Sequence, residues 1–477
     1  MNVKTILQFS IGPIGAAALS LITLPFVAWF FSVEDVGRLT MVQLIISLSV
    51  SLFSLEMHQA YVREYHEASD KQALLKMSII PGLCLLIFTI LIVAIIPFSI
   101  SNLLFGLESK TLTTLLIFGL IATFFINFLA HVLRMQERGL AFSVTQIAPK
   151  IFLFILIGLI LLIDVSAEFT VLMLINTLSI LFSLFILAWV TRSIWLESIS
   201  KNIDFNLLKK MLRFSSPLVA GGIAYWGLTF IDRLFLRHFS GFEELGIYSL
   251  SVAIAASVTV ITSIFSSIWH PILYGWAKKG IKPEKVQRVI ENMMLLVALV
   301  WSLFGLLSFT LPWFLPIEYA EIEYLIVACV AMPLFYLLSE TTGVGIGITR
   351  RSNYSMLASI SAFLVNVILN FILIPDYGSS GAALASVFAF FIFFLIKTEA
   401  SASLWCSFPR LKIYALVITY MIATTLMVLA KGKISNLYLI WILLLLLSCF
   451  FYFNRIVESF RFSKRYFRRD INVNNIQ

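Results

Sequence analysis

The sequence predicts an all-α integral membrane protein with about fourteen transmembrane helices, arranged as two related six-helix lobes followed by two additional helices. Hydrophobic residues make up 60% of the 477 positions and charged residues only 12%, about half the ~25% that is usual in soluble domains. Apolar runs of the ~20 residues needed to cross a bilayer recur along the whole chain. Ordered matches between the two halves indicate a duplication. These observations exclude a soluble enzyme or a disordered scaffold.

Each predicted span is an apolar run bounded by charged, Gly or Pro residues. The first six form one block and the other eight follow a polar connection. The predicted spans are 5–31, 38–58, 75–99, 111–133, 141–163, 168–191, 214–236, 245–271, 289–315, 322–348, 354–375, 380–402, 411–430 and 435–454. Fourteen spans leave little chain for a soluble domain.

The distribution of cations predicts the orientation in the membrane. If the N-terminus is cytoplasmic, most of the 34 Lys and Arg residues fall in inner loops or in the C-terminal tail. Basic loops are retained on the cytoplasmic side, so we expect both termini in the cytoplasm. The net charge of +9 then follows from topology, and nucleic acid is not an expected partner.

Four matches occur in the same order in both blocks, at a nearly constant offset. They pair Phe9 with Phe214, Gly37 with Gly246, Arg138 with Arg350 and Asp164 with Asp376. Because each block has an even number of spans, both copies enter the membrane in the same direction. We therefore expect them to be related by a pseudo-twofold axis along the membrane normal. Two matched lobes with a cavity between them are typical of transporters.

The repeat predicts the domain boundaries. We expect an N-terminal lobe (1–192), a cytoplasmic connecting segment (193–213), a C-terminal lobe (214–402), helices 13 and 14 (403–456) and a basic cytoplasmic tail (457–477). The connecting segment mixes Leu and Ile with Lys at helical spacing, which is compatible with an interfacial helix or with an ordinary basic linker.

Several short motifs resemble one family when they are taken together. They are Ser216-Pro217, Tyr225-Trp226, Ile231-Asp232-Arg233, the run 244–249, Asn366 with Asn370, and the runs 374–378 and 381–384. This set resembles the polysaccharide flippases of the multidrug, oligosaccharidyl-lipid and polysaccharide exporter superfamily.

The resemblance implies a bacterial inner-membrane flippase. Its expected substrate is an undecaprenyl-pyrophosphate-linked oligosaccharide, such as an O-antigen repeat unit, moved by alternating access of the two lobes. The expected partners are membrane lipids and other polysaccharide assembly proteins. The lipid II flippase has a similar plan, but its arginine cluster in the first two spans is absent here, where only Arg38 occurs. Peptidoglycan precursor is therefore disfavoured as the substrate.

Cations within or beside the spans are candidates for binding the pyrophosphate, because a charge in the bilayer interior is costly unless it faces a cavity or a partner. Lys150 lies well inside span five and Arg233 in the outer third of span seven. His131 and Arg134 are three residues apart on span four and share a face. Snorkelling to the interface and inter-helix pairing are the alternatives for these side chains.

Three acids are candidates for ion coupling. Glu56 lies beside His58 at the inner end of span two, Asp232 precedes Arg233, and Glu340 precedes a glycine-rich stretch of span ten. A carboxylate at such depth can load and release a proton, or it can be a hydrogen-bonded structural group. Asp232 and Arg233 point about 100° apart on a helix, so we expect them to contact different partners.

No catalytic set, phosphate loop or metal-binding His pair is recognisable, so we expect no enzyme activity and no cofactor. An H⁺ or Na⁺ gradient is the expected energy source. Two competing interpretations remain. An ion-coupled multidrug exporter of the same superfamily would have an acidic cavity, and a membrane polysaccharide polymerase would need a sizeable extramembrane loop.

Overall fold

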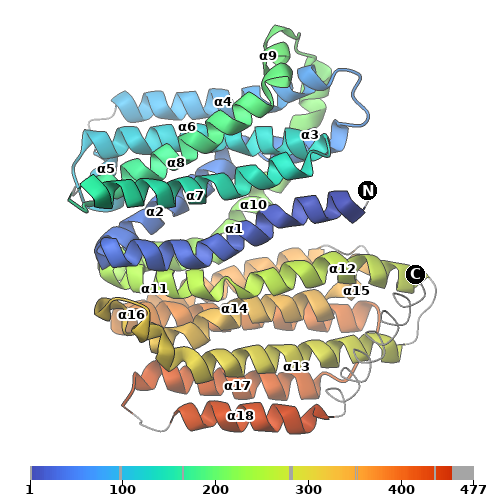
Figure 1. The fold of residues 1–477 in the computed structure, drawn as a ribbon. Coiled ribbons are helices and arrows are strands. Elements are labelled where there is room, and N and C mark those ends of the chain that lie inside the picture. Colours follow the sequence, from blue (N-terminus) through green and yellow to red (C-terminus); the bar gives the residue numbers. More distant parts are fainter. Residues whose placement is uncertain are drawn as a thin grey trace, which may run out of the picture. The chain divides into compact units, whose positions relative to one another are not determined.

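The computed structural model describes residues 3–95, 99–163, 166–278, 283–349, 351, 353–433 and 437–453. These residues form helices joined by short turns, without any strand (Figure 1). The predicted all-α fold is confirmed. The chain divides into two compact units, 1–253 and 254–477, and each is described by itself.

Unit one is built from long apolar helices with short helices between them. Its elements are α1 (Val3–Phe30), α2 (Val33–Ser54), α3 (Met57–Glu64), α4 (Lys71–Ile95), α5 (Ile100–Phe105), α6 (Lys110–Met135), α7 (Gly139–Ile163), α8 (Phe169–Val190), α9 (Arg192–Ser200), α10 (Phe205–Phe239) and most of α11 (Gly241–Ala255). Its most extensive helix packing joins α1 to α7 and α6 to α8.

Local sequence explains where α2 begins. The Ser32 hydroxyl accepts a hydrogen bond from the Asp35 amide at 3.2 Å, which satisfies one of the free N–H groups of the first turn. Glu34 and Asp35 place negative charge at the positive end of the helix dipole. Arg38 holds both carboxylates at 2.7 Å. These contacts stabilise the first turn of α2.

The packing of α1 on α7 depends on small residues. The Gly12 amide donates to the Ser143 hydroxyl at 2.9 Å, and a Cβ on Gly12 would clash with the Ser143 backbone. A Cβ on Gly15 would clash with the Ile147 side chain. Small residues that allow such close backbone approach are typical of helix pairs in membranes.

The predicted connecting segment is helical on both sides of a short break. Helix α9 ends at Ser200, and α10 begins at Phe205 and continues through the predicted span seven without interruption. Lys76 of α4 donates to the carbonyl oxygens of Ile199 and Lys201, both at 2.7 Å. These hydrogen bonds to α4 fasten the segment within unit one.

Unit two follows the same pattern. Its elements are α12 (Val258–Lys278), α13 (Pro283–Leu307), the 3₁₀ turns η1 (Ser308–Trp313) and η2 (Ile317–Tyr319), α14 (Ile322–Thr342), α15 (Val344–Ile348), α16 (Asn353–Leu404), α17 (Leu411–Ala430) and α18 (Tyr438–Phe451). Helix α14 lies at its centre and packs against α12, α13, α16 and α17, and most of its residues are buried.

The 52-residue helix α16 consists of two helices joined at a kink. Gly378 has φ 53° and ψ −130°, a conformation that a residue with a Cβ adopts at a cost. Pro375 precedes the kink and cannot donate to the helical ladder. The two halves correspond to the predicted spans eleven and twelve.

The fourteen predicted spans agree with the observed helices. Among the described residues, ten helices are long and apolar enough to cross a membrane, and α11 with the first part of α12 makes an eleventh span. The apolar helices at Ile14–Phe30 and Tyr438–Phe451 are shorter, and α16 contains two predicted spans. The protein is a multi-pass membrane protein.

Candidate functional site

A break between α2 and α3 positions the first acid. Leu55 and Glu56 adopt positive φ values of 49° and 52°, which are uncommon and costly for residues other than glycine. The carboxylate of Glu56 lies 3.4 Å from His58 Nε2 and close to Gly222 of α10, where a Cβ would approach Glu56 Oε1 to 2.9 Å. Backbone strain thus brings this carboxylate to a point where α2, α3 and α10 meet.

Two histidines from different helices lie in ring contact beside Glu56. The rings of His58 and His131 lie 4.6 Å apart between centroids, and His131 Nδ1 lies 2.7 Å from the Asn127 carbonyl oxygen. Two buried polar atoms of this region, His58 Nδ1 and Asn127 Nδ2, have no hydrogen-bond partner among the described residues. Buried polar groups are rarely left in that state, so this site is equipped to bind water, an ion or a substrate group.

Arg134 adds positive charge to the same region. It lies on α6 one turn beyond His131, and its charge acts on both imidazoles. Its guanidinium lies 5.6 Å from the centre of the Phe142 ring. We name Glu56, His58, His131 and Arg134 the α2–α6 cluster. It combines one carboxylate, one permanent cation and two imidazoles, groups that exchange protons and attract anions.

Lys150 contacts the first helix. Its ammonium donates to the Ala16 carbonyl oxygen at 2.7 Å and also to the Ser20 hydroxyl. Ser20 in turn donates to Ala16 at 2.8 Å. The cation therefore joins α7 to α1 within the predicted membrane interior, and its hydrogen bonds offset part of the cost of burying it.

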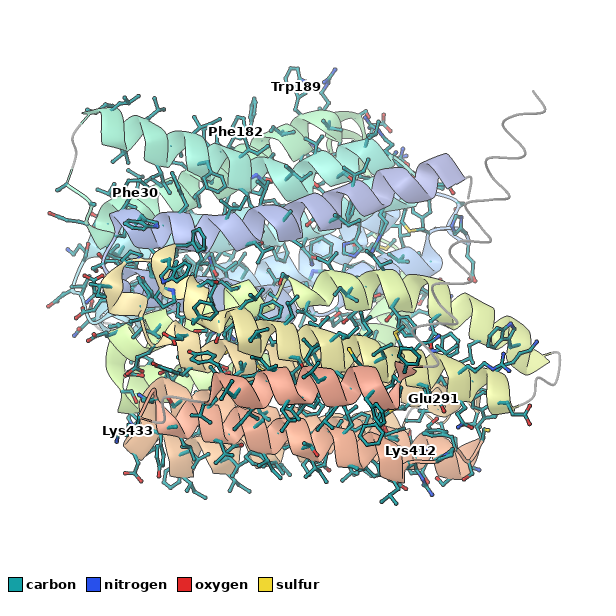
Figure 2. All side chains as sticks on the ribbon, turned by 60° about the horizontal axis from the view of Figure 1, so that its bottom comes forward. Phe30, Phe182, Trp189, Glu291, Lys412 and Lys433 are labelled. Carbon is teal, nitrogen blue, oxygen red and sulfur yellow. The ribbon has the colours of Figure 1, made fainter. Side chains whose placement is uncertain are left out.

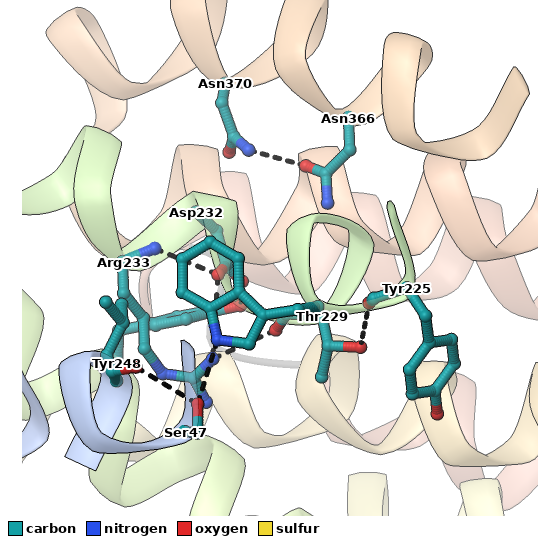
Figure 3. Close-up of polar contacts among 10 residues, drawn as sticks. Ser47, Tyr225, Thr229, Asp232, Arg233, Tyr248, Asn366 and Asn370 are labelled. Carbon is teal, nitrogen blue, oxygen red and sulfur yellow. Dashed lines mark hydrogen bonds and ion pairs between the residues drawn. The ribbon is translucent and has the colours of Figure 1, made fainter. Parts of the chain in front are cut away.

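Asp232 and Arg233 are buried and contact each other (Figure 3). Their side chains form an ion pair at 3.7 Å, so the expectation that they would have only separate partners is wrong. Each also has a partner of its own, because Tyr248 donates to Asp232 and Arg233 donates to the Thr229 carbonyl oxygen at 3.0 Å. Both side chains turn toward one point, which the ideal angle of about 100° between successive helical side chains does not anticipate.

Glu340 is paired within unit two. Lys397 of α16 contacts Glu340 of α14 at 2.8 Å, with side-chain exposures of only 11% and 14% respectively. The Lys397 ammonium also lies 5.0 Å from the centre of the Phe393 ring. Such a pair neutralises two charges that would otherwise be costly in the membrane.

The other end of α2 makes a close contact with α11. A Cβ on Gly37 would clash with the Phe242 carbonyl oxygen, and a Cβ on Gly246 would clash with the Val33 carbonyl oxygen. Each glycine thus packs on the carbonyl group four residues before the other glycine. We name this arrangement the reciprocal glycine contact. Its two glycines are one of the pairs that define the repeat.

Two arginines stack on the aromatic ring beside this contact. The guanidinium carbons of Arg237 and Arg38 lie 4.1 Å and 4.9 Å from the centre of the Phe242 ring. Stacking of this kind contributes about 0.5–1 kcal/mol where solvent is accessible. The reciprocal glycine contact and these stacked side chains hold this end of α2 and α11 together.

Sequence reasoning missed several partners. Tyr248, Ser20 and Lys397 complete the environments of Asp232, Lys150 and Glu340, and Trp226 Nε1 donates to Ser47 at 2.8 Å across α10 and α2 (Figure 3). Lys397 carried the clearest signal, because an unassigned cation in a predicted span requires a partner. Tyr248 and Trp226 belong to the motifs quoted above, which do not indicate their partners. Ser20 and Ser47 are common residue types without a distinguishing pattern.

Comparison with known proteins identifies the family. The model of the family described as "Polysaccharide biosynthesis protein" matches residues 3–274, more than half of the chain. The chain belongs to this family. The predicted resemblance is therefore confirmed, and the match includes the α2–α6 cluster, Lys150 and Asp232 with Arg233.

One curated relative of this chain is the probable low-salt glycan biosynthesis flippase Agl15 of Haloferax volcanii. The two are 21% identical over 229 residues, which cover 44% of this chain. The matched region spans 48% of the length of Agl15.

Two solved structures share the fold. The lipid II flippase MurJ in an inward closed conformation superimposes with a TM-score of 0.68 at 16% identity, covering 94% of this chain and all of MurJ. A multidrug resistance MATE transporter of the MOP superfamily, in an inward-facing conformation, gives a TM-score of 0.53 at 15% identity over 84% of this chain and 96% of its own. The chain therefore shares the fold of these two proteins.

Proposed function

We propose that this protein is a flippase that moves undecaprenyl-pyrophosphate-linked oligosaccharide repeat units, such as those of O-antigen, across a bacterial inner membrane. Its termini lie in the cytoplasm, and it acts by alternating access without catalysing a covalent step. An H⁺ or Na⁺ gradient supplies the energy.

Membership of the polysaccharide biosynthesis family is the observation that carries the proposal. A multi-pass protein with a transporter fold contributes to making a surface polysaccharide by moving a building block. Sugars are too polar to cross the hydrocarbon core unaided. A lipid-linked intermediate assembled on the inner leaflet therefore needs such a carrier.

The geometry of unit one supports an anionic substrate. Arg134, His58 and His131 gather at the end of α2 and α6 that the charge distribution predicts to be cytoplasmic. Lys150 supplies a further cation deeper in the membrane. Cations attract the phosphate groups of a lipid headgroup. Glu56, within 3.4 Å of His58, is the acid best placed to exchange a proton with such a site.

A deletion strain tests the proposal. The lipid-linked sugar would be detected with a membrane-impermeant sugar probe on spheroplasts and on inverted vesicles. We expect the intermediate to accumulate on the cytoplasmic face, surface polysaccharide to disappear, and a plasmid copy to restore both. An intermediate that reaches the periplasmic face unpolymerised would instead indicate a polymerase. Unchanged polysaccharide with increased sensitivity to cationic drugs would indicate a multidrug exporter.

A variant pair tests the role of Lys150. Replacing Lys150 by Met removes the charge and keeps the length, so we expect complementation to fall by about tenfold, a loss of ~1.4 kcal/mol. Ser20→Ala is the matched control, because it removes one acceptor and leaves the ammonium bound to Ala16. Equal losses in both variants, at equal protein levels in the membrane, would show that Lys150 only joins α7 to α1.

A further inference from the structure

Unit two contains a cavity that the proposed transport does not use. Its volume is about 610 Å³, within the range of sites that bind small ligands. Helices α13, α17 and α18 form its walls. The lining includes Glu291, Lys412, Ala415, Leu416, Tyr420 and Leu447.

The charged residues of the lining lie at one end of the cavity. Gln287, Glu291 and Lys412 lie at its mouth, and Gln287 donates to Glu291 at 2.9 Å. Figure 2 shows Glu291 and Lys412 at the same end of these helices, with Lys433 at the other end. The charge distribution of the sequence predicts that this mouth lies at the cytoplasmic interface.

The floor of the cavity is closed and needs no polar ligand. The Tyr420 hydroxyl contacts the Ser302 hydroxyl at 2.6 Å and the Ser448 hydroxyl at 3.0 Å, so its polar atom is already satisfied. The eight-residue step along α17 from Lys412 to Tyr420 corresponds to roughly 12 Å of depth at about 1.5 Å per residue. Leu416 and Leu444 line the space between. An occupant must therefore have a polar head and an apolar tail.

The cavity is open toward the surface of the unit. Ala415 and Thr419 of α17 are exposed, as are Leu447 and Phe451 of α18. Exposed apolar side chains at the level of a transmembrane helix contact lipid. A lipid of the surrounding leaflet can therefore enter from the side, with its head at the mouth and one acyl chain between the helices.

The charges at the mouth select the headgroup. Glu291 complements an ammonium group and Lys412 complements a phosphate group, so the pair matches a zwitterion. A pyrophosphate headgroup has no cation that could interact with a carboxylate at this mouth. We propose that the cavity binds a resident phospholipid with a primary amine headgroup, phosphatidylethanolamine, which is not transported. This inference goes beyond the proposed function and does not depend on it.

Photolabelling of the full-length protein in nanodiscs tests the site. The probe is phosphatidylethanolamine with a photoreactive group in the acyl chain, and labelled peptides are identified by mass spectrometry. We expect label on α13, α17 and α18, with competition by unlabelled phosphatidylethanolamine about fivefold better than by phosphatidylglycerol. Labelling elsewhere only, or equal competition by the two lipids, would overturn the proposal. Displacement of the probe by undecaprenyl pyrophosphate at lower concentration would also overturn it, by assigning the cavity to a polyprenyl carrier.

Matched variants assign the contacts. Glu291→Gln is expected to abolish the preference for phosphatidylethanolamine over phosphatidylglycerol. Lys412→Gln is expected to weaken the binding of both lipids. Glu284→Gln and Lys433→Gln are the controls, since neither residue lines the cavity. Ala415→Phe fills the opening and should remove the label, whereas Ile418→Phe, on the same helix but outside the lining, should not. An unchanged preference for phosphatidylethanolamine in Glu291→Gln, or unchanged labelling in Ala415→Phe, would contradict the assignment.

Discussion

The two partly buried acids near the ends of α2 and α14 have opposite surroundings. Glu340 of unit two makes an ion pair with Lys397 at 2.8 Å. Glu56 of unit one faces His58 at 3.4 Å on a strained backbone, and unsatisfied polar atoms lie nearby. The first arrangement is complete without a ligand. The second is complete only when a proton, a water or a substrate group arrives, so we propose that ion coupling belongs with Glu56.

The largest effect is expected from breaking the ion pair. Lys397→Ala leaves Glu340 buried without its cation, which costs about 3 kcal/mol or more. The thermal unfolding midpoint in detergent should fall and less protein should reach the membrane. Because the double variant Glu340→Gln with Lys397→Met removes both charges, it should recover most of the stability. A single variant as stable as the wild type would show that the pair is not structural.

Glu56→Gln should lower transport and leave stability almost unchanged, in contrast to Lys397→Ala. The amide keeps the size of the side chain but cannot exchange a proton, so transport should fall by at least about tenfold. The unfolding free energy should change by less than ~1 kcal/mol, because no permanent ion pair is broken. Complementation of a deletion strain and thermal unfolding would be measured on the same variant. Wild-type complementation would remove Glu56 from the coupling mechanism.

Two adjacent glycines of α10 allow the position of the Glu56 carboxylate to be tested. A Cβ on Gly222 would approach Glu56 Oε1 to 2.9 Å and Ser51 Oγ to 3.0 Å, whereas one on Gly221 would meet nothing within 4 Å. Gly222→Ala should displace the carboxylate and lower transport severalfold, by less than Glu56→Gln does, since a flexible side chain can move. Gly221→Ala should leave transport unchanged. Similar activity in the two variants would show that the position of the carboxylate is unimportant.

The smallest effect is expected at an exposed pair, Asp70 with Lys201 at 2.8 Å. The hydrogen bond from Lys201 lowers the pKa of Asp70, and the same bond raises the pKa of Lys201. The stability it contributes is therefore present above the unfolded pKa of Asp70 and is lost as pH falls below about 4. The stability that arises from the raised pKa of Lys201 is present at lower pH and is lost as pH rises above about 10.

Asp70→Asn checks this window. Its unfolding midpoint should differ slightly from that of the wild type between these limits, and the difference should shrink as the pH falls below about 4. A difference that stays constant across the acid limb would mean that the ion pair contributes nothing.

The spans were predictable because hydropathy is a local property, while the environments of the charges were not. The boundary predicted between spans eleven and twelve coincides with the kink at Gly378, and the fourteen apolar runs match the helices. No Gly or Pro indicates the break at Leu55 and Glu56. His131 is far from His58 in sequence, and only tertiary packing brings their rings together. Long-range pairing of this kind leaves no periodic pattern in a single sequence.

The reciprocal glycine contact constrains how the two copies of the repeat can diverge. Duplicated segments are normally free to accumulate changes independently. Here the carbonyl of Phe242 leaves room only for a glycine at position 37, and the carbonyl of Val33 leaves room only for a glycine at position 246. The four-residue spacing between each carbonyl and the glycine of its own helix therefore has to persist in both copies at once. A one-residue insertion in either turn would rotate one glycine by about 100° and replace it with a side chain that cannot fit. At this point of the molecule, a change in one copy is tolerated only with a matching change in the other.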